Sequence, residues 1–270
     1  MSQPAVRASI VGRLRAAGCV FAEDEADLLI AAAATLDQLE DMVQRRVSGL
    51  PLEHVVGWAE FCGLRIAVGP GVFVPRRRSE FLVGQAVAAA RQSASPGGPW
   101  LVADLCCGSG AVGVAVAAGL SALGRVELHA ADIEPAAVQC ARENVAGVGG
   151  TVYQGDLYDA LPPGLAGRVA VLVVNAPYVP TSEIAMMPPE ARLHEPFVAL
   201  DGGPDGVMIH RRVAAAAPGW LASGGCLLIE TSERQAPQTA AAMTAAGLTP
   251  MVSTDEEMDA TVVIGTRSRR

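Results

Sequence analysis

The 270-residue chain has no lysine, few aromatic residues and little charge overall. Its twenty basic residues are all arginine, which we interpret as a coding bias, and twenty-eight acidic residues give a net charge of −8. This charge repels phosphate backbones, so nucleic acid is an unlikely partner. With 51% hydrophobic and 18% charged residues, the composition excludes a disordered tail, a collagen-like repeat and a charged coiled coil. The sequence therefore predicts a folded, soluble protein with one large domain, or one large and one small.

Targeting, membrane and metal-binding signals are also missing. Segment 1–18 contains no apolar run of signal-peptide length, so we expect a cytoplasmic protein. The uncharged stretch 105–124 is long enough to suggest a membrane span, but five glycines interrupt it, and we expect no membrane partner. The six cysteines form no C-x-x-C pair and have no histidine nearby at ligand spacing. We therefore predict reduced, buried thiols and no metal site.

The hydrophobic pattern changes twice along the chain. Segment 6–47 has helical spacing and no strand pattern, which predicts a small helical unit. Segment 61–75 alternates in residue character between glycine turns, which predicts a short hairpin. A helix is predicted from Ser79, as its N-cap, to about Gln92. From Trp100 onwards, short apolar runs alternate with helical stretches, which is typical of a parallel sheet covered by helices on both faces. The predicted fold class is therefore α/β, with a late pair of strands at the sheet edge.

A glycine-rich turn follows the first strand of this predicted sheet. Gly108 and Gly110 lie where the strand turns into a helix, and they let the backbone approach a ligand closely. Asp132 ends the next strand, 24 residues after Gly108, where a carboxylate can accept both hydroxyls of a ribose. Two classes of enzyme share this layout. With Gly113, the turn satisfies the pattern G-x-G-x-x-G, and a nicotinamide-dependent dehydrogenase would use Asp132 to select NAD.

The second class binds S-adenosylmethionine (SAM) and has a further acidic residue four positions before the first glycine, near the methionine end of the cofactor. Asp104 occupies this position. A third carboxylate, Asp156, ends the following strand and either reaches the adenine edge or caps a short helix. A glycine turn without any ligand is the weaker interpretation, because acidic residues end both neighbouring strands.

The tetrapeptide Asn175–Tyr178 follows a buried strand pattern and so lies at the carboxyl end of the sheet, where open sheets bind ligands. An amide or aniline-type nitrogen is a poor nucleophile, because its lone pair is delocalised. The Asn175 side-chain oxygen and the Ala176 carbonyl can accept hydrogen bonds from its two N–H groups and hold it in line with a methyl donor. Tyr178 offers a flat face to a planar group. In isolation the segment is equally consistent with a turn, since asparagine and proline are common turn residues.

With these motifs the chain resembles the SAM-dependent protein-(glutamine-N5) methyltransferases of the HemK/PrmC type, which modify peptide-chain release factors at the glutamine of a Gly-Gly-Gln loop. The resemblance extends over nearly the whole length, and Asn-Ala-Pro-Tyr stands where the family carries Asn-Pro-Pro-Tyr. The other matching segments are residues 45–83, DLCCGSGAVGVAVA, ADIEPAAVQCARENV, HEPFVALDGGPDGV and LLIETSERQ.

The resemblance implies a class I methyltransferase fold, which is Rossmann-like with a seven-stranded, mostly parallel sheet, together with a small N-terminal helical domain. It implies a helical substrate-recognition domain over 1–58, a linking β-hairpin over 59–78 and a SAM-dependent methyltransferase domain over 79–270. The implied activity is methyl transfer from SAM to a glutamine side-chain amide of a protein substrate, a release factor with a Gly-Gly-Gln loop.

The resemblance also implies roles for individual residues. Asn175, Ala176, Pro177 and Tyr178 would hold the glutamine amide. Phe73, Arg76 and Glu195 are assigned to the substrate pocket, although Phe73 is equally well explained as a hairpin core residue and Glu195 as part of a turn. Glu230, at a strand end, either faces the site or is structural, and we expect a structural role. The residues expected to bind SAM are Asp104, Cys106, Gly108, Gly110, Asp132, Ile133, Asp156, Leu157 and Asn175.

Three features depart from the family pattern. Ala176 replaces the first proline of Asn-Pro-Pro-Tyr, but its carbonyl remains and Pro177 biases it towards an extended conformation. Segment 75–80 reads PRRRSE instead of Pro-Arg-Pro-Asp/Glu-Thr-Glu, and the extra Arg77 and Arg78 are either a solvated run or a clamp for an anionic substrate group. The N-terminal part is short, and the usual closing Ala-Gly-Arg-Asp pattern is missing. A small amino-acid-like molecule or a nucleobase amino group is therefore the alternative acceptor, and a cofactor-binding regulator without activity is a further alternative.

Overall fold

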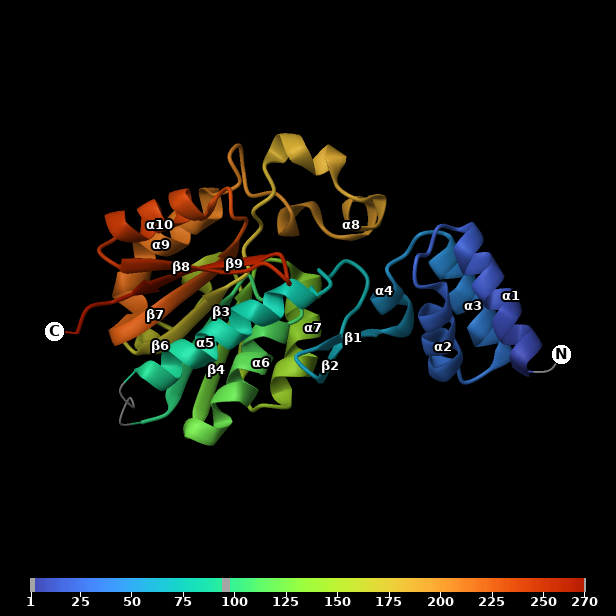
Figure 1. Ribbon diagram of the computed structural model, residues 1–270. Coiled ribbons are helices and arrows are strands. Elements are labelled where there is room, and N and C mark those ends of the chain that lie inside the picture. Colours follow the sequence, from blue (N-terminus) through green and yellow to red (C-terminus); the bar gives the residue numbers. More distant parts are fainter. Residues whose placement is uncertain (1–2, 94–97, 270) are drawn as a thin grey trace.

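The computed structural model describes residues 3–93 and 98–269 (Figure 1). Its main sheet has seven strands in the order β5-β4-β3-β6-β7-β9-β8, and the hairpin β1-β2 is separate. The strands from β5 to β7 pair in parallel, whereas β9 pairs antiparallel with both β7 and β8. The strands are β1 (Trp58–Phe61), β2 (Leu64–Ala67), β3 (Trp100–Leu105), β4 (Val126–Asp132), β5 (Thr151–Gln154), β6 (Val169–Val174), β7 (Leu221–Thr231), β8 (Thr249–Asp255) and β9 (Ala260–Thr266). The predicted α/β class, the mostly parallel sheet and the late edge pair are confirmed.

Helices cover both faces of the sheet, with α5, α6 and α7 on one side and α9 and α10 on the other (Figure 1). Because successive side chains of a strand point to opposite faces, Val173 belongs to one core and Leu172 to the other. Every residue of β3 is buried, and nearly every residue of β6. This explains why both strands are almost continuous apolar runs. The helices are α5 (Glu80–Gln92), α6 (Ala111–Leu120), α7 (Pro135–Ala146), α8 (Pro189–His194), α9 (Met208–Trp220) and α10 (Ala236–Ala245).

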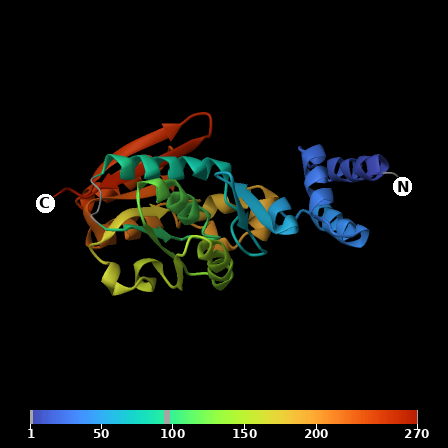
Figure 2. The ribbon, with the colours of Figure 1, turned by 90° about the horizontal axis from the view of Figure 1, so that it is seen from below.

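The N-terminal helices form a unit with its own apolar core, and Figure 2 shows it at the opposite end of the molecule from the C-terminus. In α3, Leu39, Met42 and Val43 follow the spacing of one helical face and are buried against the neighbouring helices. The unit contacts the rest of the chain where Arg46 lies 3.5 Å from Glu190 of α8. The helices are α1 (Gln3–Ala16), α2 (Ala22–Ala32), α3 (Leu36–Val47) and α4 (Leu52–Val56). The domain boundaries at 58 and 78 stay predictions.

One local prediction is confirmed in position and wrong in detail. Ser79 occupies the predicted N-cap position of α5, but its side chain makes no capping hydrogen bond. A 3-10 turn, Arg77–Ser79, precedes the helix, and the Ser79 hydroxyl faces Asn175 instead. Tertiary contact thus overrides the capping preference of serine. No helix in the described ranges is long and apolar enough to cross a membrane.

Candidate active site

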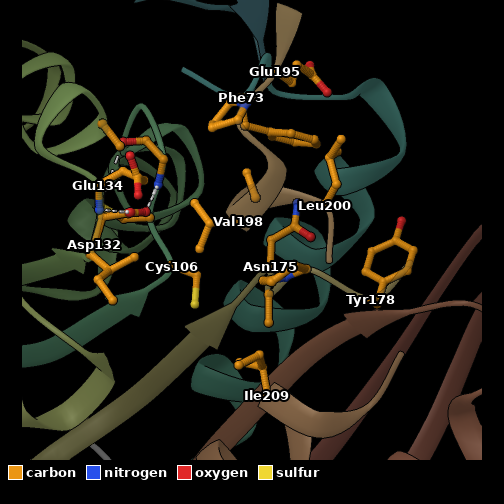
Figure 3. A pocket seen from close by; sticks show the side chains of 18 of the residues that line it. Phe73, Cys106, Asp132, Glu134, Asn175, Tyr178, Glu195, Val198, Leu200 and Ile209 are labelled. Carbon is orange, nitrogen blue, oxygen red and sulfur yellow. Dashed lines mark hydrogen bonds between the residues drawn. The ribbon is translucent and has the colours of Figure 1, made fainter. Parts of the chain in front are cut away.

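A cavity of about 450 Å³ opens at the carboxyl edge of the parallel strands (Figure 3). Its volume lies within the roughly 300–1,000 Å³ that is typical of small-molecule sites. The strand order brings the turns after β3, β4, β5 and β6 to this one edge, as expected for an open parallel sheet. All the predicted site residues except Gly110 line the cavity, namely Phe73, Arg76, Asp104, Cys106, Gly108, Asp132, Ile133, Asp156, Leu157, Asn175, Ala176, Pro177, Tyr178 and Glu195.

Gly110 does not line the cavity. It begins α6 with a left-handed backbone, φ 79°, and faces α7, where a Cβ atom would lie 3.0 Å from Val145. Gly110 therefore shapes the turn and allows two helices to pack, instead of contacting a ligand directly.

The Asp132 carboxylate is held by two backbone N–H groups at one end of the cavity. Gly108 N donates to Oδ2 at 2.8 Å and Glu134 N donates to Oδ1 at 2.9 Å (Figure 3). Burial raises the pKa of Asp132, and these two hydrogen bonds oppose that rise. Each oxygen keeps a further lone pair, so the carboxylate can still accept hydrogen bonds from a pair of hydroxyls. Glu134 also lines the cavity; it lies in the matching segment ADIEPAAVQCARENV but was not among the predicted site residues.

Asp104 lies deeper at the same end and is only 1% exposed. Its Oδ2 accepts a hydrogen bond from Gly113 N at 2.8 Å, and burial raises its pKa to about 7. A Cβ atom on Gly113 would lie 2.8 Å from that oxygen. The third glycine of the G-x-G-x-x-G pattern is therefore required by the approach of Asp104 to the helix, and it is not specific evidence for a dinucleotide.

Two non-glycine residues of the cavity wall have left-handed backbones, Cys106 with φ 55° and Leu157 with φ 51°. This conformation is strained for residues with a Cβ atom and is concentrated at functional sites. Figure 3 shows the Cys106 side chain among the cavity-lining residues. Burial raises the pKa of its thiol, so it remains neutral.

Asp156 has a partner that the sequence did not indicate. Arg212 of α9 donates to its Oδ2 at 2.7 Å, and both side chains are about half exposed. The short 3-10 turn Leu157–Ala160 has no side-chain cap from Asp156. The capping alternative is therefore wrong, and the carboxylate is an ion-pair partner at the cavity rim.

Asn175 lies in the middle of the cavity, between Asp132 and Tyr178 (Figure 3). Its Nδ2 donates to the Ser79 Oγ at 3.2 Å. In the described parts of the chain, neither Oδ1 of Asn175 nor the Ala176 carbonyl accepts a hydrogen bond. These two acceptor groups belong to consecutive residues of the cavity lining and have no protein partner in the described ranges.

Tyr178 is held by its hydroxyl and by its backbone. The hydroxyl donates to Oε1 of Glu230 at 3.4 Å, and Gln235 Nε2 donates to the Tyr178 carbonyl at 2.8 Å. Burial and the nearby Glu230 raise the pKa of the phenol, so it stays protonated. The loop 202–206 packs directly on this segment, because a Cβ atom on Gly202 would lie 2.7 Å from the Tyr178 Cα. Gln235 and this loop belong to the segments that resembled the family, which is the signal that pointed to them.

The arginine run is divided: Arg77 is exposed, as in a solvated run, whereas Arg76 and Arg78 have acidic partners. Arg76 forms an ion pair with the buried Glu195, and Arg78 Nε lies 3.7 Å from Oε1 of Glu230. Oε1 of Glu195 also accepts from Val74 N at 3.2 Å, so the residue has a more definite role than a plain turn. Burial raises the pKa of both glutamates, and their arginine partners lower it. Each of these two positive charges thus faces a negative one.

The fold and this site define a class I SAM-dependent methyltransferase. Residues 83–189 match the family described as "Methyltransferase small domain". Two solved structures with the same fold are the ribosomal protein L11 methylase from Lactobacillus delbrueckii subsp. bulgaricus and a methyltransferase from Pyrococcus furiosus. The first has a TM-score of 0.52 at 16% identity and covers 76% of this chain and 86% of its own. The second has a TM-score of 0.53 at 13% identity, and the match covers 76% of this chain and 90% of the second structure's chain. At these identities the likeness is one of fold.

Sequence comparison gives the family. The chain is 38% identical over 198 residues to the release factor glutamine methyltransferase of Streptomyces coelicolor. The aligned region covers 73% of this chain and 68% of the relative. It is 35% identical over 248 residues to that of Mycolicibacterium smegmatis, with 86% and 85% covered. The chain belongs to the release factor glutamine methyltransferase family. Its cofactor is SAM, and the nicotinamide-dependent alternative is excluded.

Proposed function

We propose that this protein transfers the methyl group of SAM to the side-chain amide of a glutamine in the Gly-Gly-Gln loop of a peptide-chain release factor. The observation that carries the proposal is the hydrogen bonding of the Asn175 side chain. Its amide nitrogen is engaged by Ser79, while its oxygen and the neighbouring Ala176 carbonyl have no partner within the described residues. Two adjacent acceptors match the two N–H groups of a primary amide.

The residues at the other end of the cavity fit SAM. In this proposal Asp132, already oriented by two backbone N–H groups, accepts the ribose hydroxyls, and Gly108 allows the backbone to lie close to the ligand. Asp104 attracts the cationic methionine end, and Asp156 with Arg212 borders the adenine. When bound, SAM supplies an activated methyl group.

The protein contributes positioning to the transfer. Asn175 and the Ala176 carbonyl hold the amide nitrogen so that its lone pair points towards the cofactor, and the rigid Tyr178 ring supports the plane of the amide. Hydrogen bonds to these acceptors strengthen as positive charge develops on the nitrogen. The attack needs no general base, because the nitrogen loses its proton after the new bond has formed.

A protein substrate suits this site better than a small anionic molecule. Arg76 and Arg78, which would otherwise attract such a molecule, face Glu195 and Glu230. The N-terminal unit, which we assign to 1–58, carries exposed apolar side chains, among them Phe21 at 69% exposure. Such a surface suits protein recognition. Release factors act in the cytoplasm, which is where we place the enzyme.

The proposal is tested with purified full-length protein, labelled SAM and a bacterial release factor that carries the Gly-Gly-Gln loop. The expected result is one labelled methyl group on the loop glutamine, found by mass spectrometry of the digested factor. A release factor in which that glutamine is replaced by asparagine is the matched control and should stay unlabelled. A protein that binds SAM but leaves the loop glutamine unlabelled would refute the proposal.

A further inference from the structure

We propose that Ser79 and Glu230 are positioning residues that determine which end of the Asn175 carboxamide meets the acceptor nitrogen. This inference rests on the proposed methyl transfer to an amide and adds two residues to its machinery. Neither residue touches the reacting atoms in this account. Both act through Asn175.

The two ends of a carboxamide have nearly the same shape and opposite hydrogen-bonding character. If the Asn175 side chain were rotated by 180°, its NH2 group would face the NH2 group of the substrate, and two donors would meet. Holding the oxygen free for the substrate therefore requires an acceptor on the Nδ2 side of Asn175. The Ser79 Oγ, 3.2 Å from Nδ2, is that acceptor. Ser79 is 1% exposed, so water does not compete for the position.

A serine hydroxyl can donate as well as accept, so its direction must itself be set. Glu230 sets it, because its carboxylate accepts from the Ser79 hydroxyl. The Glu230 side chain is buried, and its Oε2 has no hydrogen-bond partner in the ranges that the structure describes. The Ser79 hydroxyl interacts with this carboxylate and lowers its pKa, against the effect of burial. When the Ser79 proton points to Glu230, the Ser79 oxygen is left to accept from Asn175.

The surroundings of Glu230 hold it in place and oppose the rise of its pKa that burial causes. Two further groups face it, the Tyr178 hydroxyl at 3.4 Å and the Arg78 guanidinium at 3.7 Å, and both stabilise the negative charge. The inferred chain of hydrogen bonds has one direction. Its middle link is present, because Asn175 Nδ2 donates to the Ser79 Oγ at 3.2 Å. In the inferred arrangement the substrate N–H donates to the Asn175 oxygen and the Ser79 proton points to Glu230.

Neither helix capping nor space filling accounts for the Ser79 hydroxyl. The side chain does not cap α5, although Ser79 immediately precedes that helix. A serine that served only to fill space would not need its oxygen next to an amide nitrogen. The hydroxyl therefore has a polar function, which a comparison with threonine and alanine can isolate.

The first test measures initial rates of methyl transfer to the release factor for Ser79→Ala, Ser79→Thr and Glu230→Gln. Removing the hydroxyl should lower kcat about tenfold, which corresponds to the loss of one polar contact that acts in the transition state. The Kd for SAM, measured by calorimetry, should stay within about twofold of the wild type. Threonine keeps the hydroxyl and should retain most of the rate.

Glu230→Gln preserves the shape of the side chain but lets its amide donate to Ser79, which reverses the chain of hydrogen bonds. It should lower kcat about as much as Ser79→Ala. Loss of rate caused by general disruption would instead change the Kd for SAM and the melting temperature. A Ser79→Ala variant with the wild-type kcat would overturn the inference, and so would a threonine variant as impaired as the alanine variant.

The second test does not depend on activity. In NMR spectra of the 15N-labelled protein with S-adenosylhomocysteine, one of the two Asn175 side-chain protons should be shifted by its hydrogen bond to Ser79. Asn175→Asp assigns the signal. The shift should persist in Ser79→Thr and disappear in Ser79→Ala, and its absence from the wild type would overturn the inference. A wild-type protein that labels no release factor would refute the proposed function, and the spectra would still decide how Asn175 is oriented.

Discussion

The buried carboxyl of Asp104 should make the affinity for SAM depend on pH near neutrality. Burial is the main cause of its raised pKa of about 7, the Gly113 N–H opposes the rise, and the negative charge of Asp132 adds to it. SAM carries a positive charge that the ionised form of Asp104 attracts and the neutral form does not. Affinity should therefore increase as the pH rises through 7.

The size of the effect follows from the pKa. With a pKa of about 7, roughly a tenth of the Asp104 carboxyls are ionised at pH 6 and roughly nine tenths at pH 8. If SAM binds the ionised form only, its Kd should be about tenfold lower at pH 8 than at pH 6. This ratio corresponds to about 1.4 kcal/mol of binding free energy. Asp104→Asn keeps an oxygen for the Gly113 N–H but has no charge, so its Kd should lack this dependence.

Calorimetric titrations of both proteins at constant ionic strength test this prediction. Titration of the cofactor itself is common to both proteins and cancels when the two pH profiles are divided. Asp41→Asn is the matched control, because it removes one negative charge from the distant N-terminal unit and should keep the wild-type profile. Identical pH profiles for the wild type and Asp104→Asn would refute the reasoning.

The raised pKa of Asp104 also affects folding. The folded state binds this proton more tightly than the unfolded chain, whose carboxyl has a pKa near the ordinary value of 3.8. The contribution of Asp104 to stability is thus fully present below about pH 4 and is lost as the pH rises through 7. Asp104→Asn should therefore raise the melting temperature of the ligand-free protein more at pH 8 than at pH 4.

Three further predictions concern other parts of the site. Asn175→Ala should leave the Kd for SAM nearly unchanged and reduce methyl transfer about a hundredfold or more, the usual scale for a lost transition-state contact; equal turnover in rate assays would contradict the assigned role. Asp132→Ala should weaken SAM binding in a calorimetric titration by tenfold or more, because a bidentate acceptor is removed, and an unchanged Kd would exclude it as the ribose ligand. Asn144→Ala should lower the free energy of unfolding in urea by about 2–3 kcal/mol, because its side chain makes three hydrogen bonds, two to the backbone of Ala67 in the hairpin and one to the Ser109 carbonyl. A loss below about 0.5 kcal/mol would show that this contact does not fasten the hairpin.

Much of the fold was predictable, because its signals are local. The strands β3 and β6 are buried on both faces and so appear as apolar runs, and Asp104 and Asp132 interrupt such runs at their carboxyl ends. In a parallel sheet these ends meet at one edge. Composition, periodicity and strand polarity were therefore enough to bring the main carboxylates and Asn175 together.

The hydrogen bonds and ion pairs that orient the polar side chains of the site join residues far apart in the sequence. Ser79 and Asn175 are 96 positions apart, and Arg76 and Glu195 are 119 positions apart. From the neighbouring residues alone, Ser79 had the pattern of a helix cap and the arginines that of a surface run. Both interpretations were incomplete: Ser79 occupies the cap position without making the capping bond, and Arg76 and Arg78 have buried acidic partners from distant segments, which compete with water and with the local backbone. A hydrogen bond from a hydroxyl or guanidinium to a buried acceptor stabilises the fold more than the same bond at an exposed helix cap. The residues most easily assigned local roles are thus the ones whose partners have to be established from the structure.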